Sequence, residues 1–214
     1  MNNKIEKITG IARRLLYGKK ANQLELLLSA SNVKVKDIKV PDGFLLRNYK
    51  EDDANDVLSI FSLSGFNGWN KDKLDRDIKG YVDNGFFVVI DKITQKVVAT
   101  MAARRATLDS KYCKSGSITW LCTHPEYRGK GLGYIVGFSA VNRLLNDGYD
   151  EVFVNTDDKR LSAIKIFLKL GFKPLMYKHT MPARWSLIME KIGARTKKND
   201  NKLIVAWSKD EKVN

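Results

Sequence analysis

Three glycines within five positions, interleaved with two cations, are the residues of this sequence best suited to hold an anion. They lie between Arg128 and Gly133 in THPEYRGKGLGYIVG, residues 123–137, and an apolar helical pattern follows at once. The first turn of a helix has backbone N–H groups without internal partners and carries about half a positive charge. Glycine lets a ligand approach those groups closely. The segment therefore predicts a phosphate or diphosphate site; the alternative is a glycine-rich turn that only reverses the chain.

Two common nucleotide motifs do not fit this segment. A P-loop places Ser or Thr directly after its lysine, whereas Lys130 is followed by Gly131. The dinucleotide fingerprint G-x-G-x-x-G would need a third glycine where Tyr134 or Val136 stands. The predicted anion site is therefore of another kind.

The elements that must position the glycine segment follow in an order that predicts a mixed α/β sheet with flanking helices around one core. Hairpins dominate the first half and β-α-β crossovers the second, which argues against a doubly wound parallel sheet. The pattern predicts strands at 44–49, 86–91, 97–104, 115–123, 151–155 and 172–178, and helices at 51–63, 71–84, 131–146 and 161–170.

Both ends of the chain are basic. Residues 1–40 hold nine Lys/Arg against three Asp/Glu, and the tail from Lys178 holds nine against four. The pattern predicts an amphipathic helix at 4–20, which packs on its own domain or lies on a membrane or nucleic acid. It predicts a second short helix at 22–30, a polar linker at 196–200, and a strand or a loose tail at 203–207.

These features divide the chain into a basic helical extension (1–42), a core (43–178) and a second basic extension (179–214), with Pro41-Asp42-Gly43 as the turn that opens the core. The chain has 214 residues, 43% of them hydrophobic, and a formal net charge of +14. The two cysteines, Cys113 and Cys122, lack metal-ligand spacing, so we expect reduced thiols, no metal and a cytoplasmic location. The longest strongly apolar run, FFVVI at 86–90, is too short to span a membrane.

Two motifs in this order resemble those of the GNAT N-acetyltransferase superfamily. Residues 128–133, RGKGLG, match the R/Q-x-x-G-x-G/A signature, and the preceding THPEY is similar to the family's approach to that loop. Ala163-Ile164, Phe167 and 170–172 (LGF) resemble the family's A-I-x-x-Y-x-x-x-G-F stretch. The resemblance covers residues 43–178 and implies a GNAT fold.

The resemblance also implies acetyl-CoA as co-substrate. In the family, the amides of the glycine loop hold the coenzyme diphosphate, and the exposed backbone of the preceding strand pairs with the pantetheine. Two parallel strands that part, here 115–123 and 151–155, would leave that edge free. The cofactor-binding residues implied in this sequence are Leu121, Cys122, Thr123, Arg128, Gly129, Lys130, Gly131, Leu132 and Gly133.

The usual catalytic groups of the family are missing from their usual places. The family often takes a proton donor from the tyrosine of A-I-x-x-Y, but this chain has Phe167, which cannot donate. The family often has a glutamate on the strand before the loop, but SITWLCT at 117–123 contains no acid. Proximity of a bound thioester and a positioned amine is an alternative that needs no side chain.

Replacement groups are available near the predicted site. Tyr177 and His179 follow the last core strand and are candidates for proton transfer, with a structural tyrosine and a surface histidine as the alternative. Asp157 and Asp158 follow a strand end; Asp157 is a candidate base acting through water, and one of the pair is expected to cap the next helix. Cys122 should face away from Leu121 and Thr123 as a core thiol.

The sequence thus predicts an acetyl-CoA-dependent acyltransferase that acts on an amine acceptor by direct attack. Two alternatives stay open: an acyl-CoA-binding sensor without turnover, motivated by Phe167 and the acid-free strand, and a nucleic-acid or ribosome-associated protein that uses the basic ends. The sequence predicts no membrane partner, and it does not decide between a monomer and a homodimer.

Overall fold

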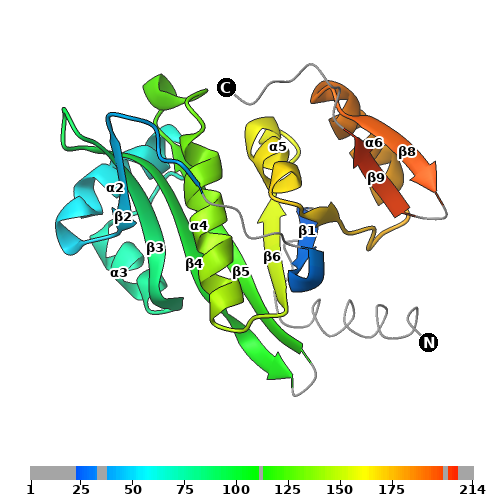
Figure 1. The fold of residues 1–214 in the computed structure, drawn as a ribbon, viewed down its shortest axis with the longest axis horizontal. Helices are drawn as coiled ribbons and strands as arrows, with labels where there is room; N and C mark the ends of the chain where they lie inside the picture. Colours follow the sequence, from blue (N-terminus) through cyan, green and yellow to red (C-terminus); the bar gives the residue numbers. More distant parts are fainter. Residues whose placement is uncertain (1–22, 33–37, 111–112, 200–201, 207–214) are drawn as a thin grey trace.

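The computed structural model describes residues 23–32, 38–110, 113–199 and 202–206. The helix predicted at 4–20 lies outside them. The predicted mixed α/β sheet with flanking helices and a single sheet at its centre is confirmed (Figure 1).

Seven strands form the central sheet in the order β2-β3-β4-β5-β6-β1-β7, and all neighbours are antiparallel except β5 and β6. A separate two-stranded sheet pairs β8 with β9. The strands are β1 (Leu24–Ser29), β2 (Phe44–Asn48), β3 (Tyr81–Asp91), β4 (Val97–Ser110), β5 (Cys113–Thr123), β6 (Glu151–Thr156), β7 (Lys173–Pro174), β8 (Arg195–Asn199) and β9 (Lys202–Ala206).

Helices cover both faces of the sheet and enclose two apolar cores. The helices are α2 (Ala54–Leu63), α3 (Lys71–Ile78), α4 (Leu132–Asn146), α5 (Leu161–Lys169) and α6 (Met181–Lys191). Figure 1 shows α4 and α5 side by side on one face, with α2 and α3 on the other. The larger core lies under α4, α5 and α6, and the smaller one under α2 and α3. Within the described residues, no helix combines the length and apolarity needed to cross a membrane.

The predicted helix at 22–30 is wrong, because this segment forms strand β1. In LELLLS the buried side chains are Leu24, Leu26 and Leu28, and the residues between them are partly exposed. This period of two matches a strand and not a helix. β1 pairs antiparallel with β6 on one side and with β7 on the other. The first strand of the described residues therefore lies inside the core sheet; the division of the chain at 42 and 178 stays a prediction.

Other expected elements have different limits in the structure. The helix predicted at 71–84 ends at Ile78, and β3 begins at Tyr81. The strand predicted at 172–178 keeps only the two residues of β7. The linker predicted at 196–200 is wrong: β8 covers most of it and pairs with β9, which occupies most of the strand expected at 203–207. Helix α6 was not predicted.

We predict that Leu26→Ala lowers the free energy of unfolding by about 2–5 kcal/mol, the usual cost of a cavity in a core. Leu27→Ala is the matched control, because its side chain is partly exposed on the other face of the same strand. Urea denaturation of both variants measures the difference. Equal losses at the two positions would contradict the assignment of this segment to the sheet.

Candidate functional site

The parallel strands β5 and β6 pair at one end and part at the other. Their register includes only Ser115 with Glu151, Gly116 with Val152 and Ser117 with Phe153. β5 continues to Thr123 and β6 to Thr156. Beyond Ser117, the edge of β5 that faces β6 has no strand partner within the described residues. An unpaired strand edge presents a row of backbone donors and acceptors to any ligand that can pair with it.

The glycine segment begins where this open edge ends. Gly129 and Gly131 have φ angles of +82° and +77°, a conformation that glycine adopts without a Cβ penalty. Helix α4 starts at Leu132, directly after Gly131. None of the five backbone N–H groups from Gly129 to Gly133 donates a hydrogen bond to another described residue. Consecutive backbone donors of this kind at a helix start are suited to an anion.

Gly133 brings the helix start against the end of β5. A Cβ at this position would lie 2.9 Å from Cδ1 of Ile166 on α5 and 3.2 Å from Oγ1 of Thr123. The absence of a side chain therefore lets α4 approach both neighbours, so that the free amides lie beside the open strand edge.

The side chains of Lys130 and Arg128 also contact residues outside the glycine segment. The Lys130 ammonium lies 4.9 Å from the ring centroid of Tyr127 and 5.7 Å from that of Phe44, in cation–π contacts. Nε of Arg128 donates to the carbonyl of Thr123 at 3.4 Å. Both side chains are exposed, so they add positive charge to the segment while bracing it.

A bulge at Trp120 decides which way the end of β5 faces. The pairing with β4 shifts between Thr100 and Ala102, and Trp120 has a φ of +62°. Ile118 packs in the larger core, whereas Trp120 and Cys122 pack in the smaller one. Leu121 packs against the larger core, so Cys122 faces away from it, as predicted.

Cys122 is a core thiol. Its side chain is 2% exposed, and burial raises its pKa to about 11, against weaker opposing effects of hydrogen bonds to Ser64 and Thr100. A thiol with this pKa is almost entirely protonated at neutral pH and is a poor nucleophile. Only its backbone is available to the opening.

Tyr177 and Asp157, two of the predicted catalytic residues, are linked by Gln23. The Tyr177 hydroxyl donates to the backbone carbonyl of Gln23, and Nε2 of Gln23 donates to Asp157 at 3.1 Å. Burial opposes ionisation of Asp157, but hydrogen bonds from Gln23 and Arg160 together outweigh it and hold the pKa of the carboxyl below its ordinary value. His179 is exposed and takes no part in this cluster within the described residues.

The predicted cap of α5 by an aspartate is wrong. The N-cap residue is Arg160, and no side chain caps the helix. Asp158 instead forms an ion pair with Arg184 of α6, with Nε donating to Oδ2 at 2.6 Å. This pair ties the segment after β6 to α6.

Arg160 is a site residue that the sequence analysis missed. Nη1 donates to the Ser64 carbonyl at 3.2 Å, and the guanidinium lies 4.1 Å from the centroid of the Phe66 ring. Nε also contacts Asp157 at 3.3 Å. Arg160 thus connects the end of β6 with the end of α2. Two of these partners, Ser64 and Phe66, lie almost a hundred positions earlier in the chain, and no local pattern predicts them.

Two further features mark what the site does not include. Phe167 is 3% exposed and packs edge-to-face on Phe172 at 5.9 Å, so this position supplies no proton.

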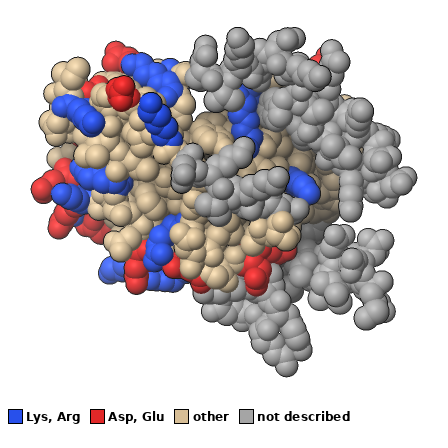
Figure 2. All heavy atoms as spheres, in the orientation of Figure 1, with Lys and Arg blue, Asp and Glu red and all other residues tan. Residues whose placement is uncertain are grey.

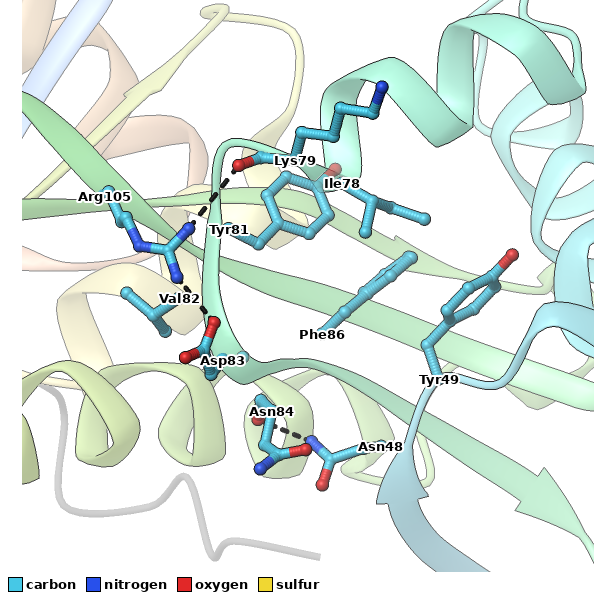
Figure 3. A pocket seen from close by; sticks show the side chains of 11 residues that line it. Asn48, Tyr49, Ile78, Lys79, Tyr81, Val82, Asp83, Asn84, Phe86 and Arg105 are labelled. Atoms are coloured by element: carbon cyan, nitrogen blue, oxygen red, sulfur yellow. Dashed lines mark hydrogen bonds and ion pairs between the residues drawn. The ribbon is translucent and has the colours of Figure 1, made fainter.

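A pocket of about 290 Å³ is lined by Tyr49, Tyr81, Phe86 and Arg105, among others (Figure 3). Tyr81 pairs with a residue of β4 whose β5 partner is Ser117. The pocket is therefore level with the paired end of β5 and away from the glycine segment.

Solved structures share this arrangement of elements. A tandem GNAT protein from the clavulanic acid biosynthesis pathway has a TM-score of 0.55 at 14% identity, over 71% of this chain and 50% of that one. Glucosamine-6-phosphate N-acetyltransferase from Arabidopsis thaliana has a TM-score of 0.51 at 18% identity, over 60% of this chain and 90% of that one. An acetyltransferase-like GNAT protein from Novosphingobium aromaticivorans has a TM-score of 0.49 at 19% identity, over 72% of this chain and 59% of that one.

The chain therefore spans only 59% and 50% of the Novosphingobium and tandem proteins. No curated protein matches it in sequence. The family profile described as "Acetyltransferase (GNAT) family" matches residues 54–172, which contain both the open strand edge and the glycine segment. Since that match extends over more than half of the sequence, the chain belongs to the GNAT acetyltransferase family.

Proposed function

We propose that this protein transfers an acetyl group from acetyl-CoA to an amine acceptor. The observation that supports this best is the run of five backbone N–H groups from Gly129 to Gly133 that have no partner among the described residues, placed beside the unpaired edge of β5. A diphosphate and an amide-containing tail need these two surfaces side by side. Family membership supports acetyl transfer in general, and the acceptor class is the part that we add.

Each part of the site has a proposed role in holding acetyl-CoA. The N–H groups of Gly129 to Gly133 bind the diphosphate, with the helix dipole of α4 and the charge of Arg128 and Lys130 favouring it. The backbone of Leu121, Cys122 and Thr123 pairs with the amides of the pantetheine, as a peptide adds to a sheet edge. The acetyl group then lies in the opening between β5 and β6.

The proposed reaction is direct attack. The neutral amine nitrogen bonds to the thioester carbonyl carbon, the C–S bond breaks, and the proton lost by nitrogen goes to the thiolate. With no acid on residues 117–123 and with Phe167 in the core, the acceleration rests mainly on positioning. Tyr177, Asp157 and His179 are the candidate proton-transfer groups; Tyr177 and Asp157 share one cluster, in which the Tyr177 hydroxyl already donates to the Gln23 carbonyl.

The charges on the described face support a compact substrate more than a polyanion. Figure 2 shows Lys and Arg side chains interspersed with Asp and Glu over the described part of that face, without a large area of one sign. The net charge of +14 is concentrated in the two ends of the chain. Nucleic-acid binding typically requires a basic stripe that neutralises several phosphates.

We predict that Gly131→Ala weakens binding of coenzyme A by roughly five- to thirtyfold, because the free loop relaxes from the left-handed conformation, which costs alanine about 1–2 kcal/mol, and binding must restore it. Gly148→Ala is the matched control: Gly148 has a φ of +76° and an equally open surrounding, but follows the other end of α4. Isothermal titration calorimetry measures both affinities. Equal affinities in the two variants, or no binding by the unchanged protein, would contradict the proposed diphosphate site.

Turnover is measured by release of free thiol from acetyl-CoA with a panel of amines. Cys122 should contribute little to the signal, because burial raises its pKa to about 11; the protein without acetyl-CoA provides the blank. Thiol release that depends on an amine is expected. Tight coenzyme binding without release from any acceptor would support the sensor alternative.

We predict that Tyr177→Phe lowers kcat less than tenfold, because the hydroxyl proton is already committed to the Gln23 carbonyl. A general acid typically contributes about 10²–10⁴ in rate. A fall of a hundredfold or more, with an unchanged KM for acetyl-CoA, would instead make Tyr177 the proton donor. Asp157→Asn, in the same cluster, is the companion measurement for the base.

A further inference from the structure

Trp120 is held in a conformation that tryptophan rarely adopts. Its φ of +62° lies in the left-handed region, where a bulky side chain is strained. Such a residue persists only when its surroundings fix it, and strained residues gather at functional sites. The bulge at Trp120 lies within the part of β5 that has lost β6 as a partner.

Contacts on its ring and on its backbone carbonyl fix Trp120. The indole Nε1 donates to Oδ2 of Asp77 at 2.7 Å, and the fully buried Thr100 hydroxyl donates to the Trp120 carbonyl at 2.8 Å. The ring stacks on Phe61 with centroids 4.9 Å apart and meets Trp69 edge-to-face at 4.4 Å. Side chain and carbonyl are therefore both anchored.

Asp77 is itself rigidly held. It lies on α3, its side chain is 14% exposed, and it accepts hydrogen bonds from three elements of the sheet. Besides Trp120 of β5, Tyr81 of β3 donates to Oδ2 at 2.6 Å, and Arg104 of β4 donates to Oδ1 at 2.8 Å. Charge-assisted bonds from several donors fix the position of a carboxylate closely. Asp77 thus ties α3 to the bulge.

The bulge changes which side chains of β5 face α4 and which face α2 and α3. Strict alternation from Ile118 would put residues 120 and 122 on the α4 side of the sheet. The extra residue reverses this, so Trp120 and Cys122 pack under α2 and α3, while Leu121 and Thr123 lie near Gly133 at the start of α4. The backbone from 120 to 123 is reoriented where the open edge meets the glycine segment.

We propose that Asp77 and Trp120 are positioning residues for acetyl transfer: through their hydrogen bond they hold the β5 bulge, which aligns the open strand edge with the glycine segment and thereby aims the acetyl group. This inference rests on the proposed function. It assigns no chemistry to either side chain, because Asp77 and Trp120 act through the backbone of β5.

The test compares Trp120→Phe with Tyr81→Phe in the full-length protein. Trp120→Phe keeps an aromatic ring in the cluster and deletes the bond to Asp77. Tyr81→Phe deletes an equally short bond to the same carboxylate oxygen, but from β3. For each variant, kcat and KM are obtained from thiol release, the Kd of coenzyme A from calorimetry, and the thermal midpoint from circular dichroism.

We expect Trp120→Phe to lower kcat by about tenfold to a hundredfold, the effect of a misplacement of roughly 1 Å at a reacting group. The Kd of coenzyme A should rise no more than about threefold, because the diphosphate donors of residues 129–133 are untouched and only the pantetheine contacts of residues 121–123 shift. Tyr81→Phe should lower the thermal midpoint similarly and leave kcat within about twofold, because Arg104 still holds the Asp77 carboxylate and the Trp120 bond to it is intact. Asp77→Ala should reproduce the kcat loss, and Asp77→Asn, which keeps an acceptor oxygen, should restore part of it.

Equal kcat values for the Trp120 and Tyr81 variants would overturn the inference and leave the proposed function standing. An equal loss of coenzyme affinity and kcat in Trp120→Phe would also overturn it, because the bulge would then serve binding in general. If the unchanged protein neither binds coenzyme A nor releases thiol, the proposed function fails and this inference fails with it. Thr100→Val, which deletes the bond to the Trp120 carbonyl, supports the inference if it lowers kcat in the same way.

Discussion

The parting of β5 and β6 is the constraint on which the rest of this structure depends. Two parallel strands share only three paired positions and then separate, so that beyond Ser117 the β6-facing edge of β5 has no strand partner within the described residues. Backbone N–H and C=O groups in a folded protein are nearly always paired. A persistent unpaired edge in the middle of a sheet is therefore costly unless water or a ligand completes it. The glycine segment adds five more donors that have no partner in the part of the chain that the structure describes.

Strand pairing and side-chain contacts connect the elements that surround this opening. On the far side of β6, the strand β1 pairs with all six of its residues, so β6 has no second free edge. At the mouth, Arg160 connects the end of β6 to the end of α2, and Asp158 with Arg184 ties the same segment to α6. These contacts hold the elements on either side of the open edge of β5 in place.

Strained backbone and close packing accumulate around the same opening. Gly129 and Gly131 adopt positive φ angles in the loop, Trp120 adopts one on the strand, and Gly133 lets α4 approach β5 and α5. The three glycines adopt their conformations and close contacts at small cost, whereas Trp120 needs the support of Asp77 and Thr100. The burial of apolar side chains on both faces of the sheet contributes free energy that offsets these local costs.

The sequence by itself determined the mixed sheet, the order of its central elements, the helix start after Gly131 and the opposite orientation of Cys122, because these follow from local periodicity and from the special role of glycine. Only the tertiary structure decided that 24–29 is a strand, since a short leucine-rich run suits either element until β6 and β7 pair with it. It also decided the bulge at Trp120, the Asp77 anchor and the Gln23 link between Tyr177 and Asp157. Their partners are distant in the chain, from 20 to 154 positions, and no local pattern encodes contacts of that range.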